Sequence, residues 1–189
     1  MIVYDPTRRR PNWTVGAAEY LETILRKTDW VFEWGAGQST VWLAERAEMV
    51  YAMEHDPSWR DKVYGYCEEA GVVNVEMDER DRFVPHYVHD LLRLAKAHAN
   101  GRGTRRVFCI DGWQRRECLD GVLETARTGD IILADDVLDY VIDEPPPPGA
   151  HVFAVPHPFR GMPISRKKPT ISLRDVHADT KETWIWEVA

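Results

Sequence analysis

Cysteine is scarce in this chain of 189 residues, and no segment has the length and apolar character needed to cross a membrane. The three cysteines, Cys67, Cys109 and Cys118, form no Cys-x-x-Cys pair and leave one over under any pairing, which argues against a disulfide framework. Residues 1–10 have no apolar run after their charges, so we expect no secretory signal. A reduced, cytoplasmic protein without a membrane partner is therefore expected.

Positive charge is also in short supply, since 24 Lys and Arg face 31 Asp and Glu and the formal net charge is −7. Proteins that bind duplex nucleic acid normally carry a basic surface, so a nucleic-acid partner is disfavoured. The seven histidines show no His-x-x-x-His or His-Glu-x-x-His spacing, which argues against a zinc site. No pattern in the sequence indicates an oligomeric state.

Hydrophobic residues make up 44% and charged residues 29% of the chain, as in globular proteins, and the length suits one domain. We expect a single domain over 1–189, divided into an N-terminal helical segment (1–28), a core (29–138) and a β-rich C-terminal part (139–189). The N-terminal segment has apolar residues at helical spacing from Ala17 to Leu25, and Thr14 is placed to cap a helix that runs to about Lys27.

From residue 29 onward, strand-like and helix-like segments alternate. We expect strands over 30–34, 49–53, 72–77, 106–110 and 130–134, and helices that end near 47, 71, 100 and 127. Near-continuous apolar strands between helices predict an α/β fold, Rossmann-like and doubly wound, with helices on both faces of a mostly parallel sheet. Further strand-like runs at 152–155, 170–173 and 184–188 predict an antiparallel C-terminal edge.

An acidic residue follows or ends every strand of this predicted parallel sheet. These acids are Glu33, Glu54 followed by Asp56, Asp78, Asp111, and the pair Asp135 and Asp136. In open α/β sheets, ligands bind beyond the carboxyl ends of the strands, so the acids would line one crevice. Such a rim would repel the pyrophosphate of a dinucleotide and favour a cationic ligand. S-adenosylmethionine (SAM), with a cationic sulfur and amino group and no phosphate, suits this rim better than NAD.

A glycine turn, Gly35-Ala36-Gly37-Gln38-Ser39, follows the first strand. We expect Gly35 and Gly37 to permit positive φ and a close ligand approach, and Ser39 or Thr40 to cap the next helix. Thr40 stands where a dinucleotide-binding turn has its third glycine. Glu54, at the end of the next strand, lies where an acid accepts hydrogen bonds from ribose hydroxyls. The neighbouring His55 would lie against an adenine ring or be solvated.

The segments EWGAGQSTVWLA, VYAMEHDPSW, FCIDGW and IILADDVL resemble the successive motifs of class I SAM-dependent methyltransferases. ETWIWEV resembles part of the antiparallel hairpin that closes the seven-stranded sheet of that family. The resemblance implies that SAM is held by Glu33, the turn from Gly35 to Ser39, Glu54 and the region of Asp111, with Asp78 near the adenine. Trp113, just after Asp111, is expected to lie against cofactor or substrate.

ILADDVL is also similar to a segment of cation-dependent, catechol-type O-methyltransferases. Asp111, Asp135 and Asp136 are therefore candidate catalytic residues and candidate ligands for Mg²⁺. Two positions depart from that pattern: Gln114 replaces a lysine base, and Asp136 replaces Asn. Without a metal, one of the adjacent carboxylates could itself be the base, or Asp135 and Asp136 could merely cap a helix.

These patterns favour a SAM-dependent methyltransferase that acts on a small molecule, at oxygen. A catalytically silent SAM- or nucleotide-binding module is the alternative, while an NAD-type oxidoreductase is disfavoured by Thr40 and the acidic rim. We expect the core to contain four of the tryptophans, Trp34, Trp42, Trp184 and Trp186. The arginine pairs 105–106 and 115–116 are expected on solvated faces.

Overall fold

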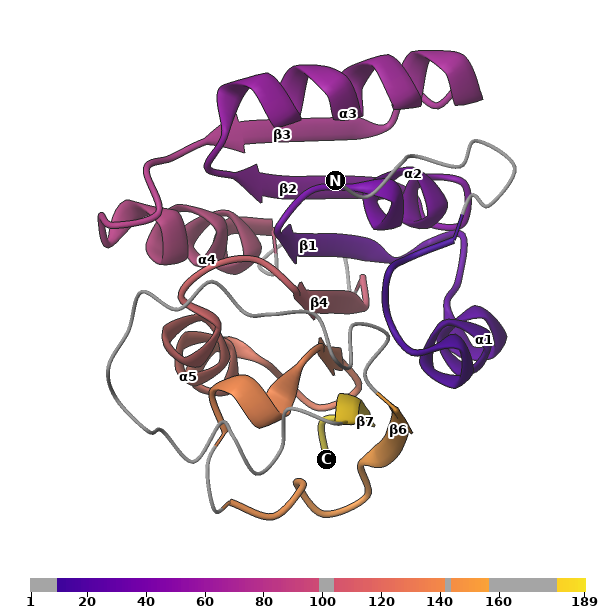
Figure 1. Ribbon diagram of the computed structural model, residues 1–189, viewed down its shortest axis with the longest axis vertical. Helices are drawn as coiled ribbons and strands as arrows, with labels where there is room; N and C mark the ends of the chain where they lie inside the picture. Colours follow the sequence, from indigo (N-terminus) through magenta and orange to yellow (C-terminus); the bar gives the residue numbers. More distant parts are fainter. Residues whose placement is uncertain (1–9, 99–103, 142–143, 157–179) are drawn as a thin grey trace.

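The computed structural model describes residues 10–98, 104–141, 144–156 and 180–189 (Figure 1). The predicted strand at 170–173 and the predicted helix end near residue 100 lie outside these ranges. Within them, no helix combines the length and apolar character that a membrane span requires.

The chain builds one seven-stranded sheet in the order β3-β2-β1-β4-β5-β7-β6. Five strands pair in parallel: β1 (Trp30–Trp34), β2 (Met49–Glu54), β3 (Val75–Glu79), β4 (Arg106–Ile110) and β5 (Ile131–Ala134). The arrowheads of β1, β2 and β3 point to the same side in Figure 1. The strand order reverses between β1 and β4, so the crevice expected to bind a ligand lies beyond the ends of these two strands.

Two strands from the end of the described chain complete the sheet. β7 (Thr180–Glu187) pairs antiparallel with β5 and with β6 (His151–Pro156). The predicted seven-stranded, mostly parallel sheet with an antiparallel C-terminal edge is confirmed. β7 begins four residues earlier than the predicted 184–188, and this extension carries Lys181 and Thr183 towards the end of β5.

Helices cover both faces of the sheet. α4 (His86–His98) and α5 (Arg115–Thr125) pack on one face, and α1 (Val15–Ile24), α2 (Gln38–Ala44) and α3 (Pro57–Ala70) pack on the other. Asp56 caps α3, where its carboxylate accepts hydrogen bonds from the N–H groups of Ser58 and Trp59, and α3 stops at Gly71 with φ 70°. The four tryptophans predicted for the core are buried.

Several sequence-based boundaries are wrong. β3 spans Val75–Glu79 rather than 72–77 because the N–H of Val72 bonds to Cys67 O and so belongs to the end of α3. α1 ends at Ile24, before the predicted Lys27. Thr14 makes no capping bond; its hydroxyl donates to Thr183 Oγ instead.

The arginine pair predicted at 105–106 is not solvated. Arg105 Nε donates to Asp29 Oδ1 at 3.0 Å, and Arg106 Nε donates to Asp130 Oδ2 at 3.0 Å. Asp29 and Asp130 are both buried. Each of these two ion pairs links residues at the amino-terminal ends of neighbouring strands. The arginines therefore stabilise the end of the sheet opposite the expected crevice.

Candidate functional site

The glycine turn packs against the loop that follows β4. Gly35 has φ 94°, and a Cβ there would lie 2.6 Å from Gly112 Cα. A side chain at Gly112 would in turn lie 2.2 Å from the hydroxyl of Tyr87. Only glycine fits at either position, because the turn after β1 packs directly against the loop that carries Asp111.

Gly37 differs from the prediction. Its φ is −176°, an extended conformation rather than the expected positive φ. Of the residues that the structure describes, a Cβ at Gly37 would meet only Ser39 Oγ, at 3.8 Å, so these residues leave the space above this backbone open. The prediction that Ser39 or Thr40 caps the next helix is wrong, because α2 begins at Gln38 and its N-cap is Gly37. Thr40, in the first turn, instead accepts a hydrogen bond through Oγ from Gly37 N at 2.8 Å.

Glu33 lies fully buried near the end of β1. Its Oε2 accepts a hydrogen bond from Thr40 Oγ at 2.6 Å, while Oε1 is buried and makes no hydrogen bond to any described residue. Burial raises the pKa of Glu33 from 4.5 to about 7, although the nearby hydroxyl groups of Ser39 and Thr40 act in the opposite direction. A buried carboxylate oxygen without a donor is the kind of group that a cationic or hydrogen-bonding ligand would satisfy.

Glu33 should make the ligand-free protein less stable as pH rises. The folded state keeps the Glu33 proton up to a pKa of about 7, whereas an unperturbed Glu releases it near 4.5, so this group contributes a loss of about 3 kcal/mol in unfolding free energy between those values. Glu33→Gln, which mimics the protonated form, is expected to lose correspondingly less stability between pH 5 and pH 8. Urea unfolding at the two pH values measures this.

The exposed Glu48 provides the matched control. Glu48→Gln should keep the wild-type pH dependence, which also contains contributions from other buried carboxylates. An identical pH dependence in wild type and Glu33→Gln would contradict the assignment of a raised pKa to Glu33.

Glu54 ends β2 with its carboxylate nearly buried. Oε1 accepts hydrogen bonds from His55 N at 2.7 Å and Asp56 N at 2.9 Å, and it lies 2.7 Å from His55 Nδ1. Oε2 receives no hydrogen bond from the described residues. The carboxylate is thus fixed in place by one oxygen and keeps the other as an acceptor, as a ribose-binding acid requires.

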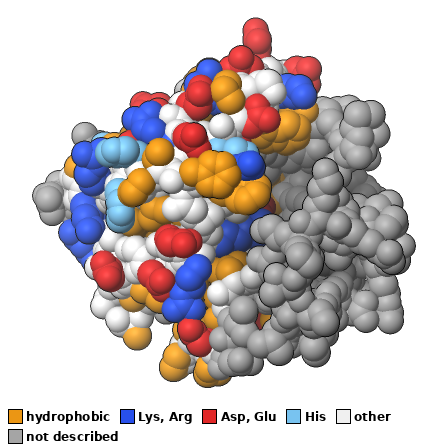
Figure 2. All heavy atoms as spheres, turned by 60° about the vertical axis from the view of Figure 1, so that its left-hand side comes forward, with side chains coloured by type: hydrophobic (Ala, Val, Ile, Leu, Met, Phe, Trp, Pro, Cys, Tyr) orange, Lys and Arg blue, Asp and Glu red, His pale blue; other side chains and the backbone are white. Residues whose placement is uncertain are grey.

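An aromatic and basic group borders this acid. The Trp113 ring is 48% exposed, lies 5.8 Å from the His55 ring and has the Arg82 guanidinium 4.0 Å from its centroid. Figure 2, in which the strand-end side of the molecule comes forward, shows hydrophobic side chains interspersed with basic and histidine side chains there. Gln114 adopts a left-handed backbone with φ 50°, and its amide donates to Arg82 O. Gln114 therefore ties together the loops after β3 and β4.

Asp78 lies within β3 rather than after it, because the strand runs on to Glu79. Its carboxylate is half-exposed, and Oδ1 accepts hydrogen bonds from Arg80 Nη1 at 2.8 Å and Glu79 N at 2.9 Å. A contact between Asp78 and adenine stays a prediction.

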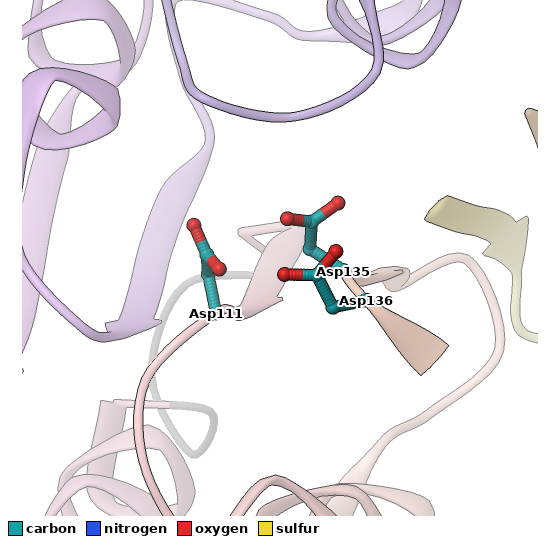
Figure 3. A group of neighbouring side chains, drawn as sticks. All are labelled: Asp111, Asp135 and Asp136. Carbon is teal, nitrogen blue, oxygen red and sulfur yellow. The ribbon is translucent and has the colours of Figure 1, made fainter. Parts of the chain in front are cut away.

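The structure brings Asp111, Asp135 and Asp136 together (Figure 3). One carboxylate oxygen from each lies within 4.8 Å of the others. Asp111 follows β4, and the other two follow the neighbouring β5, so the parallel pairing of these strands explains the cluster. Asp136 adopts a left-handed backbone with φ 50°, a conformation that Asp tolerates better than most residues.

Two cations already face these carboxylates. Lys181 Nζ, nearly buried, lies 2.7 Å from Asp135 Oδ2 and 3.3 Å from Asp136 Oδ1. Arg115 reaches Asp111 Oδ1 at 3.1 Å and Asp136 Oδ2 at 3.2 Å. The prediction that Arg115 lies on a solvated face is therefore wrong.

The second oxygen of Asp135 is also occupied. Thr183 Oγ donates to Asp135 Oδ1 at 2.5 Å, and Thr183 in turn accepts from Thr14 Oγ at 3.1 Å. Asp135 is fully buried, whereas about a fifth of the Asp111 side chain is exposed. Asp111 is therefore better placed than Asp135 to meet a substrate.

The environment of Asp111 favours its protonated form. Burial, followed by the charges of Asp135 and Asp136, raises the pKa of Asp111 well above its usual value, and Arg115 and Lys181 only partly oppose this. For Lys181, burial lowers the pKa but the facing carboxylates outweigh it, so its pKa is raised and the ammonium form is favoured. A carboxylate with a raised pKa has the character of a general base.

The sequence patterns do not identify Lys181 or Arg115 as site residues. The signal for Lys181 is the alternation Lys181-x-Thr183 in front of the apolar end of β7, which places both side chains on one face of the strand. The sequence-based prediction begins this strand at residue 184 and therefore does not include Lys181 and Thr183 in it. The role of Arg115 depends on the turn after Asp111, whose geometry no spacing rule specifies.

No family model matches the chain, and a search of curated proteins found no match. Solved structures do match. An rRNA methylase from Streptococcus thermophilus has a TM-score of 0.56 and 14% identity over 100% of both chains. TomG, an O-methyltransferase of tomaymycin synthesis from Streptomyces achromogenes in complex with SAM, has a TM-score of 0.56 and 16% identity over 100% of this chain and 93% of that one.

An RNA methyltransferase from Salinibacter ruber, in complex with S-adenosylhomocysteine (SAH), has a TM-score of 0.51 and 15% identity over 94% of this chain and 93% of that one. At these identities the likeness concerns the fold alone, and the three proteins comprise two RNA methyltransferases and one O-methyltransferase. Together with the sheet order and its antiparallel edge, it identifies the architecture: this chain has the Rossmann-like fold of the class I methyltransferases.

Proposed function

We propose that this protein is a SAM-dependent methyltransferase that methylates a hydroxyl group of a small molecule. The observation that carries the proposal is the acidic crevice itself. Near the open backbone of Gly37, Glu33 Oε1 is buried without a hydrogen bond from the described residues, and Glu54 is held through Oε1 alone. These groups suit the amino group and ribose of SAM. They would oppose the pyrophosphate of NAD.

The residues present fit SAM in chemical terms. Glu54 would accept hydrogen bonds from the ribose hydroxyls, and Glu33 would lie towards the cationic amino-acid portion. The turn from Gly35 to Ser39 would line the cofactor, with His55 and Trp113 near the adenine. When bound, SAM supplies a methyl group on a positively charged sulfur, and the transfer leaves neutral SAH.

Asp111 is the proposed general base. It accepts the proton that the acceptor hydroxyl loses as the acceptor oxygen bonds to the methyl carbon and the carbon–sulfur bond breaks. Arg115, which bridges Asp111 and Asp136, holds the base in place. We propose a positioning role for Asp135, because both of its oxygens face protein groups, and for Asp136. Methyl transfer depends heavily on such alignment.

A catalytically silent binding module is the rival function. A binding module, like an enzyme, would need Glu33 and Glu54 to hold SAM. It would not need a partly exposed carboxylate of raised pKa at the end of β4. The character of Asp111 therefore favours catalysis.

The test is methyl transfer from isotopically labelled SAM to a panel of small phenols, alcohols and amines, with RNA as a separate acceptor. We expect label on hydroxyl-bearing small molecules. Label on amines or RNA alone would contradict the acceptor class, and SAM binding without transfer to any acceptor would favour the silent module.

A further inference from the structure

The cluster of three carboxylates contains five oxygens that already face protein donors. Thr183 donates to Asp135 Oδ1, and the Lys181 ammonium forms an ion pair with Asp135 Oδ2 at 2.7 Å without the geometry of a hydrogen bond. The oxygens of Asp136 face Lys181 and Arg115. Asp111 Oδ1 faces Arg115, which leaves Asp111 Oδ2 as the oxygen that faces no donor among the described residues. A hard divalent cation needs several carboxylate or carbonyl oxygens at once, so this arrangement does not fit the Mg²⁺ site suggested by the sequence.

The position of Lys181 follows from the sheet. In the antiparallel pairing of β5 with β7, Ala134 lies opposite Trp184, so the residues before Trp184 extend past the end of β5. Lys181 and Thr183 are two residues apart and point to the same face, and both reach Asp135. The ammonium group therefore comes from a strand and is nearly buried, unlike a mobile surface lysine.

We propose that the Lys181 ammonium takes the place of a divalent cation among Asp111, Asp135 and Asp136, and that removing it converts the cluster into a divalent-metal site. Lys181 is then a positioning residue that acts through Asp135 and Asp136. The catalytic meaning of this inference rests on the proposed function, but its metal-binding consequence does not. Methyl transfer by the wild type should be unaffected by a chelator.

The experiment is titration of the full chain with Mn²⁺, followed by electron paramagnetic resonance. Lys181→Met is expected to bind Mn²⁺ at least 10-fold more tightly than the wild type. Adding Asp111→Ala to that variant should reverse the gain, because it removes a carboxylate ligand and leaves no other oxygen in its place. Lys96→Met, a change at an exposed lysine of α4, should leave Mn²⁺ binding at the wild-type level.

Circular dichroism establishes that each variant is folded, and Lys181→Gln serves in place of Lys181→Met should the latter not fold. Equal Mn²⁺ binding by the wild type and the folded Lys181 variant would overturn the inference, whether both bind tightly or neither does. A parallel titration with SAH keeps the two hypotheses apart. If the wild type does not bind SAH, the result counts against the proposed function. If the wild type binds Mn²⁺ tightly, the result counts against this inference.

Discussion

Replacing Glu54 by Gln is expected to weaken SAH binding by about 10- to 100-fold, which corresponds to about 1.5–3 kcal/mol for a hydrogen bond to a charged group. Hydrogen bonds from the N–H groups of His55 and Asp56 fix one carboxylate oxygen, and Oε2 is left as the acceptor for the ribose. The Gln amide keeps the shape but loses the charge and offers only one acceptor oxygen. Calorimetric titration measures the change.

Two comparisons make the Glu54 result specific. Glu76→Gln, at an exposed position of β3, should leave SAH affinity within about 2-fold of the wild type. An SAH analogue without the ribose hydroxyls should bind wild type and Glu54→Gln almost equally, because the missing interaction is already absent from the ligand. A Glu54→Gln protein that is folded and binds SAH like the wild type would remove Glu54 from the cofactor site.

Replacing Asp111 by Asn is expected to lower kcat by about 10²- to 10⁴-fold, the usual contribution of a general base. The Asn side chain preserves the size of Asp111 but cannot accept the acceptor's proton. SAH affinity should change far less than turnover, because the lost proton transfer belongs to the chemical step. Asp120→Asn, at an exposed residue of the neighbouring helix α5, should keep wild-type kcat.

The pH profile of the wild type gives a second readout for Asp111. Asp111 must be deprotonated to act as a base, so the rate should fall as the pH drops through its pKa. Because burial and the neighbouring carboxylates raise that pKa, the fall should occur at a higher pH than for an ordinary Asp, whose pKa is about 3.9. Substantial turnover by Asp111→Asn with an unchanged acid limb would contradict the assignment.

Much of the fold could be predicted because its determinants are local. Apolar runs such as 30–34 and 106–110 define buried parallel strands, and the acids after them must meet at one edge of the sheet. Together with the strand order that the family resemblance implies, this rule predicts that Asp111, Asp135 and Asp136 lie together. The folded chain brings one carboxylate oxygen of each within 4.8 Å of the others.

What the sequence did not reveal depends on contacts between distant residues. Lys181 meets Asp135 only because β7 pairs antiparallel with β5 in one particular register. The extended φ of Gly37 and the close approach of Gly35 to Gly112 are likewise properties of two loops packed together. A pattern of residue types identified the acids but could not show which charges neutralise them.

The most direct test of the proposed cofactor is calorimetric titration of the wild-type protein with SAM and, separately, with NAD. In this acidic crevice Glu33 Oε1 accepts no hydrogen bond from the described residues, and Glu54 is held through Oε1 alone. We therefore predict that SAM binds at least about 10-fold more tightly than NAD, because one hydrogen bond to a charged group contributes about 1.5 kcal/mol or more. Binding of NAD without binding of SAM would contradict this prediction, and the acids of the crevice would then need a different ligand.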